Sequence, residues 1–354
     1  MTVEKRIKAF AKLGEFLTQF QPSGIVKNET APLNELFFEP FNLQVNRAYE
    51  FNGWFTKENV LSAFSKWGNI LNYSNLNKWT YQYNLNTLTP LKIGVIMAGN
   101  IPLVGFHDFL SVLISGHNII VKQSSSDSHF LPLIAKYLEY AEPEFKGRIQ
   151  FTEDRMHNFD AVIATGSNNT ARYFDYYFGK YPSIIRRNRN SVAVLTNQET
   201  EGDLKKLGED IFRYFGLGCR SVSKLFVPQG YDFDPFFTAI YQYKELIYYD
   251  KYVNNYDYNK AVYLMSQYQL LENGFLMLKE DQSYASPIAT VFYEYYDDAQ
   301  VLQKRLEADK ELIQCVVGSS DQQKMVGFGE TQNPQLWDYA DDVDTLDFLQ
   351  GLRV

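Results

Sequence analysis

The sequence predicts an α/β protein built around parallel β-sheets, and three short apolar runs carry that prediction. Residues 91–97, 118–121 and 161–165 are rich in β-branched and other apolar side chains, and each run is followed by a turn and a helical stretch. Strands and helices that alternate at this spacing are typical of βαβ units, in which the connected strands run parallel. Such sheets bind ligands at the carboxyl ends of their strands. Those ends are therefore candidate site positions.

Helices are expected before and between these strands. The first 75 residues are expected to be largely helical, and they are rich in aromatic side chains. The first strand is followed by a helix at residues 107–115, which Gly116 closes, as a glycine often does at a helix C-terminus. The second strand is followed by a helix that ends near Tyr140. This order predicts a Rossmann-like domain.

A second set of strands and helices begins near Arg186, where we expect the chain to change domain. It comprises strands at 191–195, 223–227 and 289–293 and a helix at 200–214. We therefore expect residues 1–186 to form the Rossmann-like domain with its helical N-terminal region. Residues 187–354 are expected to form a smaller α/β domain, whose C-terminal segment is a candidate to pack back on the first domain.

Composition and charge exclude several classes of protein. Hydrophobic residues make up 45% and charged residues 21% of the chain, as in globular proteins. The net charge of −8 argues against a nucleic-acid partner, because neutralising phosphates requires a basic face. No window approaches the roughly 18–20 apolar residues of a membrane span, and the N-terminus lacks the apolar core of a signal peptide. We expect a cytoplasmic protein.

The two cysteines differ in their surroundings. Cys315 lies in the apolar run 312–317, so it is expected to be a buried, inert thiol. Cys219 lies in the segment FGLGCRSVSK, with glycines before it and Arg220 after it. Glycines let a ligand approach the backbone, and an adjacent cation favours the thiolate. These residues alone leave a structural thiol and a nucleophile equally open. With two cysteines, four histidines and no CxxC motif, no metal site is expected.

Small and polar residues gather at the predicted strand ends. They include neither a GxGxxG fingerprint nor a P-loop, so a standard dinucleotide motif is absent. The Thr-Gly-Ser turn is also expected as an ordinary strand-to-helix connection capped by Ser167 or Asn168, and this role is compatible with ligand binding. The strand-end residues are Gly99, Asn100, Lys122, Gln123, Ser124, Thr165, Gly166 and Ser167.

The order of these motifs resembles the aldehyde dehydrogenase superfamily. Its motifs are matched in order by AGNIP at 98–102, SGHNIIVK at 115–122, TGS at 165–167 and GLGC at 216–219. Within the superfamily, GLGCRSVSKLFVP and FGETQNPQLWDYADDVDTLDFL are similar to acyl-CoA reductases related to the fatty-acid reductase of bacterial bioluminescence. The resemblance implies an aldehyde-dehydrogenase-like fold, with a Rossmann-like cofactor domain and a smaller α/β catalytic domain.

The resemblance implies an oxidoreductase that reduces an acyl-CoA, of the fatty acyl class, to the aldehyde. Cys219 matches the nucleophile, which forms a covalent acyl intermediate. The Asn100 side chain and the Cys219 backbone N–H match the groups that stabilise the oxyanion. A turn-forming role is the alternative for Asn100. The implied partners are the acyl-CoA substrate and further copies of the chain, in a dimer or tetramer.

The resemblance also implies how a nicotinamide cofactor is bound. Lys122 matches the lysine that contacts the adenosine ribose, and Ser125 stands where NAD-preferring relatives often carry an acid. A hydroxyl tolerates a 2′-phosphate, which favours NADPH, whereas an acid from elsewhere, such as Asp127, would favour NADH. The implied cofactor-binding residues are Gly99, Lys122, Ser124, Ser125, Thr165, Gly166 and Ser167.

Two departures from the superfamily pattern bear on the reaction. Hydrolytic aldehyde dehydrogenases carry a glutamate base where RRNRNS stands here, at residues 186–191. Arginine stays protonated, so this change argues against oxidation to a free acid. The arginines either contact CoA phosphates or form a salt-bridged surface turn. Relatives also carry a ribose-binding glutamate where SYASP stands, at residues 283–287.

Two alternative functions stay open at this point. A non-hydrolytic, CoA-acylating aldehyde dehydrogenase would use the same residues in the opposite direction. A nucleotide- or acyl-binding protein that has lost turnover would keep the fold, and the missing ribose glutamate favours it.

Overall fold

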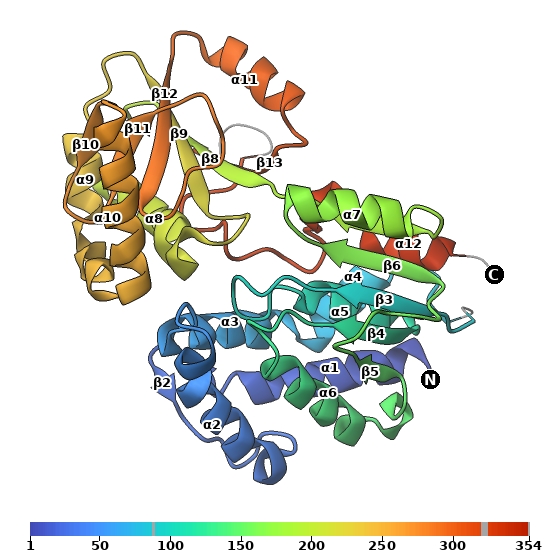
Figure 1. Ribbon diagram of the computed structural model, residues 1–354. Coiled ribbons are helices and arrows are strands. Elements are labelled where there is room, and N and C mark those ends of the chain that lie inside the picture. The colour runs from blue at the N-terminus through green and yellow to red at the C-terminus, as the bar shows by residue number, and fades with distance from the viewer. Residues whose placement is uncertain (87–88, 320–324, 353–354) are drawn as a thin grey trace. The chain divides into compact units, whose positions relative to one another are not determined.

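The computed structural model describes residues 1–86, 89–319 and 325–352 (Figure 1). The chain divides into two compact units. Unit 1 comprises Met1–Arg187 together with Gln335–Val354, and unit 2 comprises Asn188–Pro334. Each unit has its own β-sheet with helices packed against it. The α/β fold class is confirmed, since both main sheets are largely parallel.

Unit 1 is built around a five-stranded parallel sheet with the strand order β5-β4-β3-β6-β7. The three apolar runs of the sequence form β3, β4 and β6, as predicted. The strands are β1 (Phe20–Gln21), β2 (Gly24–Ile25), β3 (Lys92–Ile96), β4 (Asn118–Lys122), β5 (Ile149–Phe151), β6 (Ala161–Thr165) and β7 (Ser183–Arg186). The α-helices are α1 (Val3–Leu17), α2 (Asn34–Phe51), α3 (Lys57–Ile70), α4 (Tyr73–Thr80), α5 (Phe106–Ser115), α6 (Phe130–Ala141), α7 (Asn168–Phe178) and α12 (Thr345–Gly351).

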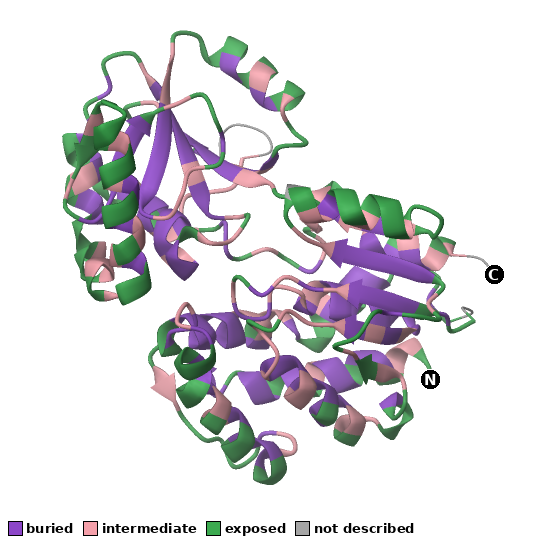
Figure 2. Ribbon diagram, in the orientation of Figure 1, coloured by how far each residue is buried: buried purple, intermediate pink, exposed green. Residues whose placement is uncertain are grey.

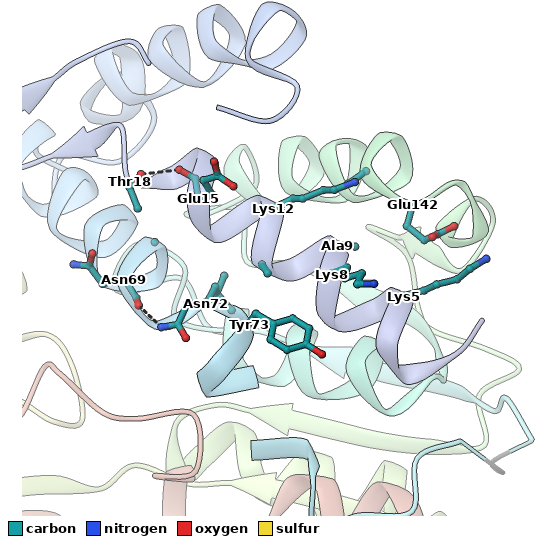
Figure 3. Close-up of a pocket in the computed structure, with 14 residues that line it drawn as sticks. Lys5, Lys8, Ala9, Lys12, Glu15, Thr18, Asn69, Asn72, Tyr73 and Glu142 are labelled. Atoms are coloured by element: carbon teal, nitrogen blue, oxygen red, sulfur yellow. Dashed lines mark hydrogen bonds between the residues drawn. The ribbon is translucent and has the colours of Figure 1, made fainter. Parts of the chain in front are cut away.

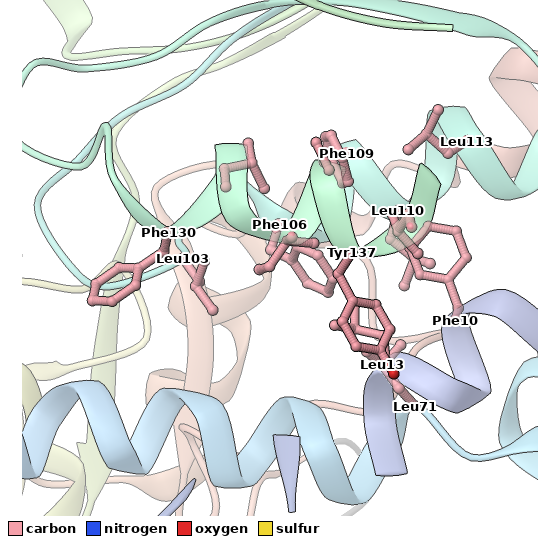
Figure 4. Close-up of a cluster of buried hydrophobic side chains, with 14 of the residues drawn as sticks. Phe10, Leu13, Leu71, Leu103, Phe106, Phe109, Leu110, Leu113, Phe130 and Tyr137 are labelled. Carbon is pink, nitrogen blue, oxygen red and sulfur yellow. The ribbon is translucent and has the colours of Figure 1, made fainter. Parts of the chain in front are cut away.

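Aromatic side chains fill the core of unit 1 between its helices. Figure 4 shows Phe10 of α1 and Tyr137 of α6 near the α5 side chains Phe106 and Leu110. All four are buried, and burial of such large apolar surfaces is the main stabilising contribution to a core. The Tyr137 hydroxyl also donates to the backbone oxygen of Lys12, so its polar end is satisfied. The helical N-terminal region therefore forms part of this core.

Unit 2 is built around a six-stranded sheet with the order β10-β11-β12-β9-β8-β13, in which only β10 pairs antiparallel. Figure 2 shows the inner strands of both sheets as buried. The strands are β8 (Asn190–Val194), β9 (Val222–Pro228), β10 (Leu270–Glu272), β11 (Met277–Glu280), β12 (Thr290–Tyr296) and β13 (Ile313–Val317). The α-helices are α8 (Glu201–Phe212), α9 (Asp234–Ile240), α10 (Asp250–Met265) and α11 (Ala299–Ala308).

A buried ion pair attaches the C-terminal segment to unit 1. Arg186, the last residue of β7, places Nη2 2.7 Å from Oδ1 of Asp108 on α5. The same guanidinium donates to the backbone oxygen of Ala340 at 2.8 Å and to Oγ1 of Thr345 at 2.9 Å. Arg186 is only 5% exposed, so the interpretation of this arginine as part of a solvated surface turn is wrong.

His107 makes a second attachment of the C-terminal segment. Its Nε2 lies 2.9 Å from the backbone oxygen of Leu336, and its ring packs beside Trp79 and Tyr339. Trp79 Nε1 donates to the Tyr339 hydroxyl at 2.8 Å. His107 therefore acts here as a packed, hydrogen-bonded side chain. Among the described residues, no helix is both long enough and apolar enough to span a bilayer.

Replacing Arg186 with methionine is expected to lower the free energy of unfolding of unit 1 by about 3–5 kcal/mol, because it leaves the buried carboxylate of Asp108 without its charge partner. Tryptophan fluorescence during urea unfolding measures this, since all four tryptophans lie in unit 1. The matched control is Arg187→Met. Arg187 pairs with Asp175 on the surface, where such a pair contributes less than about 1 kcal/mol. Equal losses in the two variants would contradict the prediction.

Candidate active site

The strand-end residues of unit 1 share one edge of its sheet. Ile96, the last residue of β3, pairs with Lys122 at the end of β4 and with Ala164 near the end of β6. The segments that follow these three strands therefore begin side by side. Lys122 and Thr165 are the last residues of β4 and β6, and the segments after the strands contain Asn100 and the other five implied cofactor-binding residues. The structure thus brings together the residues that the sequence singled out in unit 1.

Gly99 and Ser124 belong to neighbouring loops that touch. A Cβ atom on Gly99 would lie 2.7 Å from both Cβ and Oγ of Ser124, so any larger residue would push the loops apart. Ser124 also begins a tight turn: its Oγ accepts from Ser126 N at 3.2 Å, and its backbone oxygen accepts from Asp127 N at 3.1 Å. This turn leaves Ser125 exposed.

Asp127 connects the turn to the loop that carries Asn100. Its Oδ2 accepts a hydrogen bond of 2.9 Å from the backbone N–H of Leu103, which has a left-handed φ of 58°. Burial raises the pKa of Asp127 to about 7, against the opposing effect of the Leu103 N–H. This carboxyl group therefore supports the Asn100 loop, and Asn100 itself is exposed on that loop.

The remaining strand-end residues have local partners. Lys122 donates from Nζ to the backbone oxygen of Asp154 at 3.1 Å. Ser167 caps α7, because its Oγ accepts from Thr170 N at 3.3 Å, so the capping role expected from the sequence is confirmed. A Cβ on Gly166 would lie 2.9 Å from the Phe174 ring, which shows how closely α7 approaches the strand end.

Cys219 lies in unit 2, in a turn just before β9. The turn is closed by a hydrogen bond from Ser221 N to Gly218 O at 3.0 Å, and Cys219 is exposed. Ser191 Oγ donates to the Cys219 backbone oxygen at 2.9 Å. Cys315 lies on β13 and is only 5% exposed, so its expected burial is confirmed. Of the two cysteines, only Cys219 is accessible to a substrate.

Strained backbone precedes this turn, and sequence reasoning did not predict it. Tyr214 and Phe215 both have a φ of 57°, and Gly216 has a φ of 75°. The left-handed conformation costs a residue with a Cβ atom about 1–2 kcal/mol. The Phe215 ring packs against Tyr249 and Tyr252 at centroid distances of 5.1 and 6.1 Å, which offsets this cost. The only local signal was Gly216.

Arg220 contacts groups of the surrounding unit. Its Nη1 donates to the backbone oxygen of Thr331 and to Sγ of Cys315, both at 3.4 Å. Its effect on the Cys219 thiol stays a prediction. Of the arginines before β8, Arg187 pairs with Asp175 as the surface interpretation expected, and Arg189 donates to the backbone oxygen of Lys310.

The segment that lacks a ribose-binding glutamate lies next to the start of β9. Ser223 Oγ, four residues after Cys219, donates to the backbone oxygen of Tyr284 at 2.7 Å. The Tyr284 hydroxyl in turn donates to Oδ2 of Asp309 at 2.5 Å. Sequence reasoning named this segment but did not predict its hydrogen bond to the strand after Cys219.

A cavity of about 620 Å³ lies elsewhere in unit 1, along α1. Figure 3 shows Lys5, Lys8 and Lys12 of α1 on its wall, with Asn72 and Tyr73 among the residues across from them. Two of these lysines form ion pairs, Lys5 with Glu144 and Lys8 with Glu4. None of the predicted site residues lines this cavity, so it does not mark the candidate active site.

A family model described as acyl-CoA reductase (LuxC) matches residues 55–240, which is more than half of the chain. The chain belongs to the acyl-CoA reductase (LuxC) family. The expected membership is thereby confirmed, and the protein is an oxidoreductase that acts on aldehyde or acyl groups. The matched residues of this LuxC family member include Asn100, the strand-end residues of unit 1 and Cys219.

Solved structures are similar to this LuxC family member in fold. An NADP-dependent enzyme from E. coli has a TM-score of 0.63 and 11% identity, with 90% of this chain and 73% of that chain covered. A NAD-dependent benzaldehyde dehydrogenase from Corynebacterium glutamicum gives 0.61 and 12%, covering 90% and 76%. Aldehyde dehydrogenase 21 from Physcomitrella patens gives 0.66 and 10%, covering 99% and 84%. These structures confirm the aldehyde-dehydrogenase-like fold. No curated protein matches the sequence.

Replacing Asp127 with asparagine is expected to remove a pH dependence of stability. Its pKa of about 7 in the folded state lies above the ordinary aspartate value, so the folded protein binds this proton more tightly than the unfolded chain does. The stabilisation is full below about pH 4 and is lost as the pH rises to about 7. The free energy of unfolding of Asp127→Asn, minus that of wild type, should therefore rise by about 2–3 kcal/mol from pH 5 to 8.

Urea unfolding followed by tryptophan fluorescence at several pH values checks this prediction. The control is Asp154→Asn, whose difference from wild type is expected to change little over the same range, because Asp154 is exposed. A difference for Asp127→Asn that does not depend on pH would contradict the prediction.

Proposed function

We propose that this protein reduces a fatty acyl-CoA to the aldehyde, with NADPH as reductant and a covalent acyl intermediate on Cys219. The observation that carries the proposal is the exposed Cys219 in a glycine-rich turn of a LuxC family chain. The family supplies the reaction class. The proposal adds the residues, the intermediate and the preferred cofactor.

The first step transfers the acyl group to the enzyme. The Cys219 thiolate attacks the thioester carbonyl of the acyl-CoA, a new C–S bond forms, and the C–S bond to CoA breaks. The departing CoA thiolate then takes up a proton. A covalent step of this kind divides one difficult reaction into two easier ones. The glycines of the turn, Gly216 and Gly218, keep side-chain bulk away from the carbonyl.

Asn100 and the Cys219 backbone N–H are the proposed donors to the oxyanion that forms when the carbonyl is attacked. A single donor of this type contributes about 10²–10³ in rate. The bond between Asp127 and Leu103 supports this role, because it fixes the loop on which Asn100 lies.

In the second half of the reaction, the carbonyl of the acyl group on Cys219 would take up a hydride, for which a bound nicotinamide would be the source, and would become a thiohemiacetal. Its C–S bond then breaks, which releases the aldehyde and restores the Cys219 thiolate.

The residues at the position of the hydrolytic base favour reduction over hydrolysis. Arg186 is buried in an ion pair with Asp108, and Arg187 pairs with Asp175. Neither guanidinium can accept a proton near neutral pH, so neither activates a water molecule. An acyl group on Cys219 then leaves by reduction or by return to CoA. Return of the acyl group to CoA is the last step of the CoA-acylating direction, so that alternative reaction would use the same residues.

The strand-end edge of unit 1 fits a nicotinamide cofactor. Gly99 is buried against Ser124, Asn100 and Ser125 are exposed in the two neighbouring loops, and Lys122 supplies a cation. When bound, the cofactor supplies the hydride. Ser125 is exposed and uncharged, and Asp127 is bonded to Leu103, so neither offers a free carboxylate that would repel a 2′-phosphate. This arrangement supports NADPH. A cytoplasmic location and a dimer or tetramer stay predictions.

The thioester mechanism predicts that the protein incubated with acyl-CoA, in the absence of cofactor, gains the mass of one acyl group on Cys219. Intact mass spectrometry with peptide mapping measures this, using acetyl-, octanoyl- and palmitoyl-CoA. Addition of NADPH should remove the adduct and release aldehyde. Cys219→Ala should show no adduct, whereas the control Cys315→Ala should still gain it on Cys219, because the buried Cys315 is not the thiol that is acylated.

Absence of any adduct with all three acyl-CoAs would contradict the mechanism. If NADPH still bound, the result would favour the binding-protein alternative. An adduct that NADPH leaves in place, while NAD⁺ and CoA support aldehyde oxidation, would favour the CoA-acylating dehydrogenase.

The proposed preference for NADPH depends on Ser125. In Ser125→Asp, a carboxylate would repel the 2′-phosphate and could pair with the ribose hydroxyls of NADH. Because of this repulsion, we expect kcat/KM for NADPH to fall about tenfold, which corresponds to about 1.4 kcal/mol. The change in kcat/KM for NADH should be smaller. The matched control is Ser126→Asp, the exposed next residue. Equal effects of the two variants on both cofactors would exclude a specific role for Ser125.

A further inference from the structure

The loop at residues 327–333, here called the C-terminal loop, is attached to α8 by a buried carboxylate. Asp210 lies near the end of α8 and is fully buried. Its Oδ2 accepts from Gly329 N at 2.6 Å, and its Oδ1 accepts from Thr331 N at 3.0 Å and from Thr331 Oγ1 at 2.8 Å. Hydrogen bonds to a buried charged group are the strong ones. One side chain therefore sets the position of this loop.

The C-terminal loop in turn contacts the residues that follow Cys219. The backbone oxygen of Thr331 accepts from Arg220 Nη1 at 3.4 Å, and Gln332 Nε2 donates to Ser221 Oγ at 3.4 Å. Ser191 Oγ donates to Cys219 itself. Three consecutive residues, from the cysteine onward, are thus held by hydrogen bonds from other parts of unit 2. Thr331, Gln332 and Ser221 are all buried, so water does not readily replace these contacts.

The backbone on the other side of Cys219 requires such support. Tyr214 and Phe215 are held in the left-handed conformation between α8 and the Cys219 turn. Strained residues persist only where their surroundings fix them, and they gather at functional sites. Asp210 lies four residues before Tyr214 in the chain. Through Thr331 and Arg220 it is connected to the residue directly after Cys219. The strained segment and the turn are therefore bridged at both ends by the C-terminal loop.

We propose that Asp210 is a positioning residue, which fixes the C-terminal loop and through it holds Cys219 in the conformation that attacks the acyl carbonyl. This inference rests on the proposed function of Cys219. It gives a role to the FGETQN stretch, which the mechanism above does not use. Asp210 acts through Thr331, because its own carboxylate is buried and occupied by the loop.

The test compares Thr331→Val with Asp210→Asn. Thr331→Val keeps the shape of the side chain and removes only the hydroxyl that donates to Asp210, so it remains informative if Asp210→Asn fails to fold. The readouts are the single-turnover rate of Cys219 acylation by palmitoyl-CoA and the amide hydrogen exchange of residues 213–221. We expect acylation to slow by about 10- to 100-fold, the range for a lost hydrogen bond to a charged group. Exchange should become faster, and Thr331→Ser should restore both.

The matched control is Thr200→Val at the opposite end of α8. Thr200 Oγ1 donates to Asp203 at 2.6 Å, so this variant also removes a threonine–aspartate hydrogen bond from the same helix. It is expected to lower stability without changing either readout. Unchanged acylation and exchange in Thr331→Val, measured well below its unfolding temperature, would overturn the inference. Faster exchange with unchanged acylation would also overturn it, since the loop would then be purely structural.

Failure of the proposed function is a separate outcome. If wild type forms no acyl adduct, the proposed function is wrong. The positioning role of Asp210 is then tested by the rate at which iodoacetamide alkylates Cys219, together with the amide hydrogen exchange of residues 213–221. An alkylation rate in Thr331→Val at least threefold different from wild type, with faster exchange, would support positioning of the thiol. Equal rates would overturn it.

Discussion

The position of β3 between two parallel neighbours is the constraint on which unit 1 depends. Its backbone hydrogen bonds to β4 and β6 bring the ends of all three strands to one edge of the sheet. Asn100 and the implied cofactor-binding residues lie at these ends or within a few positions after them. Two further contacts refine the edge. Gly99 lets two loops touch, and Asp127 fixes one of them through Leu103.

In unit 2 the exposed thiol of Cys219 lies on a turn, and the residues before this turn have an unfavourable backbone conformation. The left-handed residues Tyr214 and Phe215 cost free energy, and aromatic packing offsets that cost. Ser191 and the C-terminal loop then fix the turn by hydrogen bonds. The thiol proposed as the nucleophile is thus exposed while hydrogen bonds hold its turn, an arrangement that suits the proposed covalent step.

The fold tolerates wide divergence in sequence. The three solved structures described above are only 10–12% identical to this chain, yet 90% or more of it is covered by each. Cores accept many combinations of apolar residues of suitable volume, so the pattern of burial persists where individual residues do not. The residues that carry chemistry are a small part of such a chain. Family membership therefore rests on the match over residues 55–240 rather than on overall identity.

The sequence by itself determined the strands β3, β4 and β6, the difference between the two cysteines and the resemblance to the family. These features are local: a short apolar run, a glycine after it and a thiol among glycines can be recognised without knowing what lies nearby. Only the tertiary structure decided the partners of Arg186, Asp127 and Asp210. Each bonds to residues that are distant in the chain or held in an unusual conformation, and no local pattern encodes them. The left-handed conformation before Cys219 could not be predicted for the same reason. Tyr249 and Tyr252 pack against Phe215 and stabilise a backbone conformation that local preferences disfavour.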